Sequence, residues 1–198
     1  MKRILCTIFA LFMLCSVLIL TACGNADQKE ENTTEATTPE ATTPAETTTG
    51  EEKTTSFYTE WATYDDGTFS FSYPKTWGLM EGMVGDSELS NSIVVMTEPK
   101  NDSYAQMDTA TYKNEMEALF AAMGLSVVEA SVEQTKLENG LDATVMFYAL
   151  EMEDVWMGET TVAITIGETT YSVVISEVVK DTGLLETVLA SLAITPAA

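Results

Sequence analysis

The feature that most constrains the fold is the uneven distribution of large apolar residues along the 198-residue chain. Residues 24–55 contain no Val, Ile, Leu, Met, Phe, Tyr or Trp, whereas residues 57–198 hold all seven Tyr and all three Trp. A segment without apolar side chains cannot offset the entropy lost on ordering. A domain of about 150 residues, by contrast, buries roughly 68 to 70% of its unfolded surface. The sequence therefore predicts one globular domain, residues 56–198.

Residues 1–22 have the pattern of a lipoprotein signal peptide. Lys2 and Arg3 precede an uncharged apolar run over residues 4–20, and the following Leu-Thr-Ala-Cys resembles the bacterial lipobox. This resemblance implies cleavage before Cys23, lipidation of Cys23 with diacylglycerol and palmitate, and anchoring to the bacterial cell membrane. The alternative is an uncleaved transmembrane helix, because the run approaches the roughly 20 residues that span a bilayer. In both cases the rest of the chain is expected to be extracytoplasmic.

Residues 23–55 are predicted to be the lipidated cysteine followed by a disordered stalk rich in Thr, Glu and Pro. The stalk contains eleven Thr and the direct repeat Glu-Ala-Thr-Thr-Pro at residues 35–39 and 40–44. Such a composition favours an extended coil, which would hold the domain away from the membrane. O-glycosylation of the Thr run is a chemical alternative.

The composition excludes several kinds of chemistry. The chain has no histidine, and its cysteines are Cys6, Cys15 and Cys23, so the domain has no thiol. Ser-His-Asp and Cys-His catalysis, His-ligated zinc and disulfides are therefore excluded from the domain. The formal net charge is -22, which disfavours nucleic acid as a partner. No catalytic residue and no cofactor is predicted.

The first part of the domain has the pattern of β-hairpins. Residues 68–73 alternate between aromatic side chains and Ser, which predicts a half-buried strand. The turn-forming Asp65-Asp66-Gly67 sequence separates this strand from the aromatic segment 57–64. Residues 78–84 and 92–98 are predicted to form a second pair of strands, with a polar loop between them.

The second part combines helices with a meander. Apolar spacing predicts an amphipathic helix over residues 109–123, ended by Gly124. Period-two patterns predict four strands over residues 125–136, 141–150, 156–166 and 170–179, with a turn at Asn139 and Gly140. Asp181 is predicted to cap a last helix, in which Leu185, Val188, Leu189 and Leu192 form the buried stripe.

This order of elements predicts an α+β fold with a mainly antiparallel sheet. Together with the Phe-Ser-Phe-Ser-Tyr-Pro-x-x-Trp stretch over residues 69–77, it resembles the PsbP-like family across about residues 57–195. The resemblance implies an α-β-α sandwich with two main helices. Members of this family serve as photosystem subunits, nuclear-import cofactors and small bacterial lipoproteins, and most are not enzymes. The resemblance supplies no catalytic motif to carry over.

A search for chemistry within the domain gives weak patterns only. Ser72 and Lys75 have the Ser-x-x-Lys spacing of penicillin-binding enzymes, but they follow a strand and lack the partner motifs. Chance is therefore the better explanation of that spacing. Carboxylates that could hold a hard cation gather in three places, although without the spacing of an EF-hand loop. These places are Asp65 with Asp66, Asp86 with Glu88, and Glu151 with Glu153 and Asp154.

Three tryptophans and several methionines could line a ligand groove, with core packing as the simpler interpretation. Trp61 and Trp156 lie among acidic residues and would mark a partner surface if they were exposed together. Trp77 is predicted to be buried, because it follows the strand whose other aromatic residues face inward. The residues in question are Trp61, Trp77, Trp156, Met80, Met83, Met152 and Met157.

The sequence favours a membrane-anchored, non-catalytic binding or accessory module whose ligand is a protein, a peptide or an envelope component. The alternatives are a carboxylate- and metal-dependent envelope enzyme, and a spacer or surface antigen without a specific ligand. Residues 57–198 carry 23 acidic and 5 basic side chains, a net charge of -18. A partner that is neutral or cationic on the contacting side is therefore expected.

Overall fold

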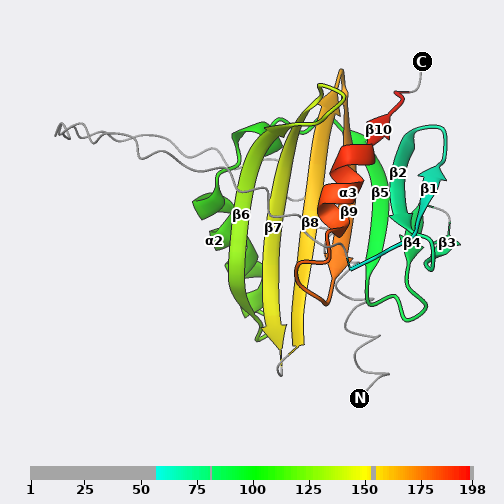
Figure 1. Ribbon diagram of the computed structural model, residues 1–198. Helices are drawn as coiled ribbons and strands as arrows, with labels where there is room; N and C mark the ends of the chain where they lie inside the picture. Colours follow the sequence, from blue (N-terminus) through cyan, green and yellow to red (C-terminus); the bar gives the residue numbers. More distant parts are fainter. Residues whose placement is uncertain (1–56, 81, 153–154, 197–198) are drawn as a thin grey trace, which may run out of the picture.

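The computed structural model describes residues 57–80, 82–152 and 155–196. Within them the chain forms an α+β domain with two sheets, one of seven strands and one of three (Figure 1). Every pair of neighbouring strands in both sheets is antiparallel. The predicted α+β fold with a mainly antiparallel sheet and two main helices is confirmed. The division into two sheets was not predicted.

The large sheet has the order β3-β4-β5-β9-β8-β7-β6, and the small sheet has the order β1-β2-β10. The strands of the large sheet are β3 (Gly78–Met80), β4 (Met83–Gly85), β5 (Ser92–Pro99), β6 (Ser126–Lys136), β7 (Asp142–Met152), β8 (Val155–Ile166) and β9 (Thr169–Glu177). Those of the small sheet are β1 (Trp61–Asp65), β2 (Phe69–Pro74) and β10 (Ala193–Ile194).

Two main helices lie on opposite faces of the large sheet, as the α-β-α prediction requires. Helix α2 (Thr109–Ala121) packs against β6 and β7, whereas α3 (Leu184–Ser191) packs on the other face, against β2. Figure 1 shows α2 behind β6 and α3 in front of β8 and β9. A short 3-10 helix, η1 (Tyr104–Gln106), precedes α2. No helix among residues 57–80, 82–152 and 155–196 is long and apolar enough to cross a membrane.

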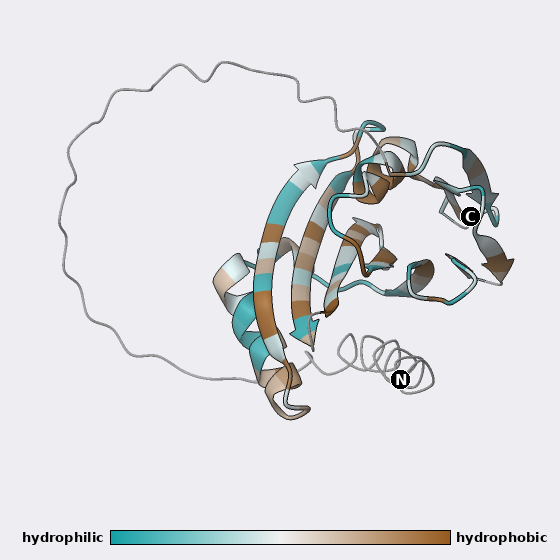
Figure 2. Cartoon of the chain, turned by 60° about the horizontal axis from the view of Figure 1, so that its bottom comes forward, coloured by the Kyte–Doolittle hydropathy of each residue, from teal (hydrophilic) through white to brown (hydrophobic). Residues whose placement is uncertain are grey.

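Each face of the large sheet has its own core, because its central strands are apolar on both sides. The core under α3 extends to the small sheet and includes Phe71 of β2, Val162 of β8 and Leu184 of α3. The face under α2 includes Tyr112, Phe120 and Tyr148. Figure 2 shows the hydrophobic and hydrophilic bands that alternate along the strands. Trp77 is 7% exposed, so its predicted burial is confirmed.

The predicted turns and the first helix are confirmed. Strands β1 and β2 form a hairpin around the Asp65 turn, and β6 and β7 form a hairpin around Gly140, whose φ is 84°. Helix α2 begins after Asp108, whose carboxylate accepts hydrogen bonds from the backbone N–H groups of Ala110 and Thr111 at 2.9 and 3.0 Å. These N–H groups have no partner within the helix, so the carboxylate fixes its first turn.

Two local predictions were wrong. Residues 78–84 are not one strand, because the chain turns at Gly82, whose φ is 70°, and β3 pairs with β4. Asp181 does not cap the last helix, since it adopts a left-handed backbone with φ 55° and the helix begins only at Leu184. The hydroxyl of Thr182 instead accepts the hydrogen bond from the Leu184 N–H at 3.1 Å.

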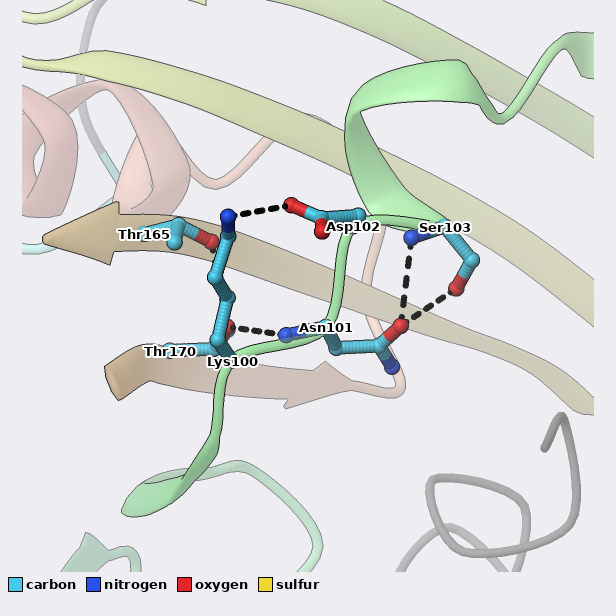
Figure 3. A network of polar contacts seen from close by, with 6 residues as sticks. All are labelled: Lys100, Asn101, Asp102, Ser103, Thr165 and Thr170. Atoms are coloured by element: carbon cyan, nitrogen blue, oxygen red, sulfur yellow. Dashed lines mark hydrogen bonds and ion pairs between the residues drawn. The ribbon is translucent and has the colours of Figure 1, made fainter. Parts of the chain in front are cut away.

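A network of polar contacts fixes the crossing from β5 to the α2 face (Figure 3). The backbone N–H of Asn101 donates to Thr170 Oγ1 at 3.0 Å, and Thr170 Oγ1 lies 3.0 Å from Thr165 Oγ1. The side chain of Asn101 accepts from both the N–H and the hydroxyl of Ser103. Since the two threonines lie beside the turn between β8 and β9, the segment before η1 is tied to that end of the β8–β9 hairpin.

The predictions for residues 1–55 lie outside the described residues. They include the signal peptide, the lipidated Cys23 and the stalk. The structure therefore describes only the part of the chain that was predicted to form the domain.

Candidate functional site

A groove lies between the β1–β2 hairpin and the strands β3 to β5. It encloses about 650 Å3, and its walls include Phe69, Leu79, Met80 and Met96. Leu79 is 62% exposed and Met80 is 45% exposed, although both are apolar. A groove that presents exposed apolar side chains can gain free energy by covering them with a partner. We call it the hairpin groove.

One end of the hairpin groove is acidic, because Asp65 and Asp66 lie in its wall. Their carboxylates already serve the hairpin turn. Asp65 accepts from the Gly67 N–H at 2.9 Å, and Asp66 accepts from two backbone N–H groups and from the Tyr64 hydroxyl. Partial burial raises the pKa of Asp66, but the hydrogen bonds from Phe69, Thr68 and Tyr64 outweigh burial and leave that pKa below its usual value. Asp66 therefore stays negatively charged in mild acid.

The other predicted carboxylate clusters do not form a cation site within the described residues. Asp86 accepts four hydrogen bonds inside its own loop, from Glu88, Ser90 and Asn91. Glu151 is exposed at the end of β7, and its predicted partners Glu153 and Asp154 lie outside the described residues. In the part of the chain that the structure describes, no group of three or more Asp, Glu, His or Cys could hold a metal ion.

A second hollow lies beside the start of α3, on the α3 face of the large sheet. It encloses about 180 Å3 and includes Phe147 of β7, Trp156 and Thr160 of β8, and Glu177 at the end of β9. The rings of Phe147 and Trp156 stack with centroids 6.3 Å apart. A β-carbon on Gly158 would overlap the indole, 2.8 Å from Cζ2. The glycine therefore lets the indole lie close against its own strand; we call this hollow the Trp156 pocket.

The Trp156 pocket has an acidic rim. Glu129, Asp181 and Glu186 line it together with Glu177, and Lys180 is its one basic residue. Burial raises the pKa of Glu177, and the charges of Glu186 and Asp181 raise it further, while a hydrogen bond from the Thr182 hydroxyl partly opposes them. The rim therefore brings four carboxyl groups together around one lysine.

Tyr58 connects this rim to the aromatic core. Its ring makes edge contacts with Trp61 and Trp77, at centroid distances of 5.9 and 5.7 Å. Burial, followed by the charges of Glu177 and Asp86, raises the pKa of Tyr58 to about 12. The negative field of the rim thus extends to the start of the domain.

The lysines of the domain are almost all engaged by carboxylates. Four ion pairs occur among the described residues: Lys75 with Glu60, Lys100 with Asp102, Lys113 with Glu117 and Lys136 with Asp142. Lys180 differs, because its Nζ lies 5.3 Å from the centroid of the Trp156 ring and it has no carboxylate partner among the described residues. The surface therefore presents many carboxylates and few unengaged positive charges.

A buried carboxyl group lies on the opposite face, under α2. Glu159 is 3% exposed, and its oxygens accept from the Tyr148 hydroxyl at 3.0 Å and the Ser176 hydroxyl at 3.5 Å. Burial and the nearby charge of Glu159 raise the pKa of Tyr112. Hydrogen-bonded in this way, Glu159 fits a structural role in the core.

The structure separates several groups that the sequence could have placed together. Trp61 packs on Tyr58, whereas Trp156 packs on Phe147, and both are half-buried. Met80 lines the hairpin groove, but Met157 is buried under α2. Trp61 and Trp156 therefore do not form the shared surface that was considered on condition that both were exposed together, and Met80 and Met157 do not line one groove.

The Ser-x-x-Lys spacing has no catalytic arrangement. Ser72 lies within β2, where its N–H donates to Ser191 Oγ at 2.8 Å, and Lys75 pairs with Glu60. No helix start brings the amine to the hydroxyl.

Sequence reasoning missed both hollows, because each is assembled from distant segments. Phe147, Trp156 and Glu177 come from three neighbouring strands, and Leu79 and Tyr64 come from different sheets. One signal was available: Gly158 interrupts a strand two residues after Trp156, and a glycine within a strand often marks a close approach.

No family model and no curated protein matches the chain. A solution structure of cyanobacterial PsbP (CyanoP) from Synechocystis is similar at 16% identity and a TM-score of 0.47, covering 75% of this chain and 98% of that one. A crystal structure from Bacteroides thetaiotaomicron is similar at 15% identity and a TM-score of 0.38, and the match covers 65% of this chain but 45% of that one. Conclusions about the fold rest on the strands and helices described above.

Proposed function

We propose that this chain is a membrane-anchored extracytoplasmic lipoprotein whose domain is a non-catalytic binding module. In this proposal a lipid on Cys23 holds the chain at the membrane, and residues 24–55 act as a tether. The domain binds a segment of a protein partner in the hairpin groove. The observation that carries the proposal is this groove of about 650 Å3 with Leu79 and Met80 exposed in its wall.

The chemistry of the groove indicates which segment it would take. An apolar side chain would cover Leu79 and Met80, while a basic side chain would face Asp65 and Asp66 at the acidic end. The net charge of -18 over residues 57–198 would attract a cationic partner over roughly 8 Å at physiological salt. The predicted partner surface is therefore apolar and basic.

The carboxylates of the hairpin groove are better suited to binding than to catalysis. Asp66 accepts three hydrogen bonds that hold the turn, and they lower its pKa. A general acid needs a pKa near the working pH, which requires the opposite shift. The groove is thus suited to charge recognition.

The groove is tested with a photo-reactive amino acid placed at Leu79 in cells that express the whole chain. The matched control carries the same group at Val128, which is 48% exposed on β6 at the far edge of the large sheet. We expect a protein adduct from position 79 and none from position 128. Met80→Asp should remove that adduct. Equal adducts at both positions would contradict the groove proposal.

The anchor is tested separately by replacing Cys23 with Ser. The variant should lose labelling by radioactive palmitate and should no longer be cleaved before residue 23, because it has no thiol to acylate. A variant that is still processed before residue 23 and equally membrane-bound would contradict lipid anchoring. This result would leave the groove experiment interpretable.

A further inference from the structure

We propose that the Trp156 pocket binds an organic ammonium group, and that Lys180 occupies the pocket when no such ligand is present. This site lies on the α3 face and is separate from the hairpin groove, so the inference stands or falls independently of the proposed function. The ligand class is an alkylammonium ion, from either a lysine side chain or a free amine.

The size of the pocket limits what it can hold. Its volume of about 180 Å3 corresponds to about six water molecules at roughly 30 Å3 each. Pockets for drug-sized ligands begin at roughly 300 Å3. The pocket therefore suits one side-chain-sized group.

The aromatic rings of Trp156 and Phe147, which we call the aromatic floor of the pocket, already lie beside a cation. Lys180 Nζ lies 5.3 Å from the centroid of the Trp156 ring, within the roughly 6 Å over which an aromatic face attracts an ammonium group. Phe147 stacks beside the indole and widens the aromatic surface. Lys180 thus shows the position and the chemistry of the ligand that the floor accepts.

The rim favours the same kind of ligand. Four carboxylates surround the pocket, those of Glu129, Glu177, Asp181 and Glu186, against the single ammonium of Lys180. After burial, the charges of Glu186 and Asp181 contribute to the raised pKa of Glu177. A second cation would relieve the repulsion between these charges, whereas a neutral or anionic ligand would not.

Lys180 can leave the pocket at small cost. It is exposed, it lies between β9 and α3, and among the described residues no carboxylate holds it. A cation held over one aromatic ring near the surface is stabilised only weakly. An incoming ammonium would therefore compete with Lys180 for the indole.

The experiment titrates the full chain in detergent micelles with butylammonium chloride and follows the indole N–H signal of Trp156 by NMR. Trp156→Phe identifies that signal, and n-butanol serves as the uncharged control. We expect a saturating shift with butylammonium only. Lys180→Met should tighten binding by about two- to fivefold, because it removes the internal competitor. The matched control, Lys113→Met, removes an exposed lysine of α2 and should leave the affinity unchanged.

A second ligand distinguishes the two sources of the ammonium group. Saturation by Nα-acetyl-lysine methylamide would support a lysine side chain of a partner, and saturation by butylammonium alone would support a free amine. Equal shifts with n-butanol would overturn the proposal. Lys180→Met binding no more tightly than the unaltered chain would also overturn it.

Discussion

The two main helices cover opposite faces of one sheet, but different interactions hold them there. Helix α2 has 13 residues and begins with the Asp108 carboxylate as its cap, and the face beneath it contains tyrosine hydroxyls and the buried Glu159. Helix α3 has eight residues and begins at Leu184, after Gly183, which has no side chain to form a cap bond, and aliphatic and aromatic side chains make up the core beneath it. A helix of eight residues is unstable alone, so α3 depends on its packing.

This packing gives α3 a second role. Leu184 and Val188 are fully buried, and α3 contacts β2 of the small sheet. Ser191 near its end accepts the hydrogen bond from the Ser72 N–H at 2.8 Å. Helix α3 therefore joins the two sheets, whereas α2 covers one. The comparison implies that the α3 face is sensitive to lost volume and the α2 face to lost hydrogen bonds.

The largest effect is expected on the α3 face. Trp77→Ala should lower the free energy of unfolding by about 3 to 5 kcal/mol, because it removes a large buried side chain from the core that joins the sheets. Urea denaturation of the purified chain measures this change. A loss below about 1 kcal/mol would show that the α3 face tolerates a cavity.

Loss of a buried tyrosine hydroxyl should cost more on the α2 face than on the α3 face. Tyr148→Phe removes the hydroxyl that donates to Glu159 and should cost about 1 to 3 kcal/mol, because a buried carboxyl oxygen loses its donor. The control is Tyr171→Phe, which removes a hydroxyl from the α3 face. The same denaturation series compares them. Equal losses of unfolding free energy in the two variants would show that the two faces do not differ in their sensitivity to a lost hydroxyl.

A smaller effect is expected at the helix starts. Asp108→Ala should destabilise α2, since two N–H groups of its first turn lose their acceptor. Asp181→Asn should leave stability almost unchanged, because Thr182 and not Asp181 serves the first turn of α3. Thermal melting followed by circular dichroism compares the variants. A larger loss from Asp181→Asn would restore the role predicted from the sequence.

The smallest effect is a difference in pH dependence. The pKa of Glu177 is raised in the folded chain, so its contribution to stability is complete below the unfolded pKa of about 4.3 and is lost as pH rises through the folded pKa. Glu177→Gln should remove this loss. The pKa of Asp66 is lowered, so its contribution is present above the unfolded pKa of about 3.9 and is lost as pH falls through the folded pKa.

Stability against pH from 3 to 8 measures both slopes. Asp66→Asn should be least stable relative to the unaltered chain near neutral pH, and Glu177→Gln should be least stable relative to it in acid. Parallel curves for the three proteins would contradict the assigned shifts.

The elements that the sequence predicted well are those with local causes. Asp65 and Gly67 form a turn with their own neighbours, and residues 109–121 bury a helical stripe after a capping carboxylate. The error at Asp181 has a local cause as well, because the hydroxyl of Thr182, one residue later, accepts the hydrogen bond from the Leu184 N–H. Hydrogen bonds between residues close in the sequence can be predicted from residue spacing. Where two neighbouring side chains, such as Asp181 and Thr182, could both accept from one backbone N–H group, the spacing does not decide between them.

The elements that the sequence did not predict depend on long-range pairing. Strand β9 lies beside β5, and the chain end pairs with β2 as β10. Periodicity shows which side chains share a face but not which strands are neighbours. The hairpin groove and the Trp156 pocket both follow from such neighbours, and the contact of Lys180 with Trp156 follows from the path between β9 and α3.

The free edge of β6 bears on how many copies of this protein can lie close together. An unpaired strand edge is a template on which a second chain can add a strand and begin aggregation. Here the register shifts between Val127 and Glu129, and Thr109 Oγ1 of α2 accepts from the Val132 N–H at 3.0 Å. The irregular register and the hydroxyl leave little uninterrupted backbone for an intruding strand. Both features oppose the addition of a second chain along β6 when copies are crowded.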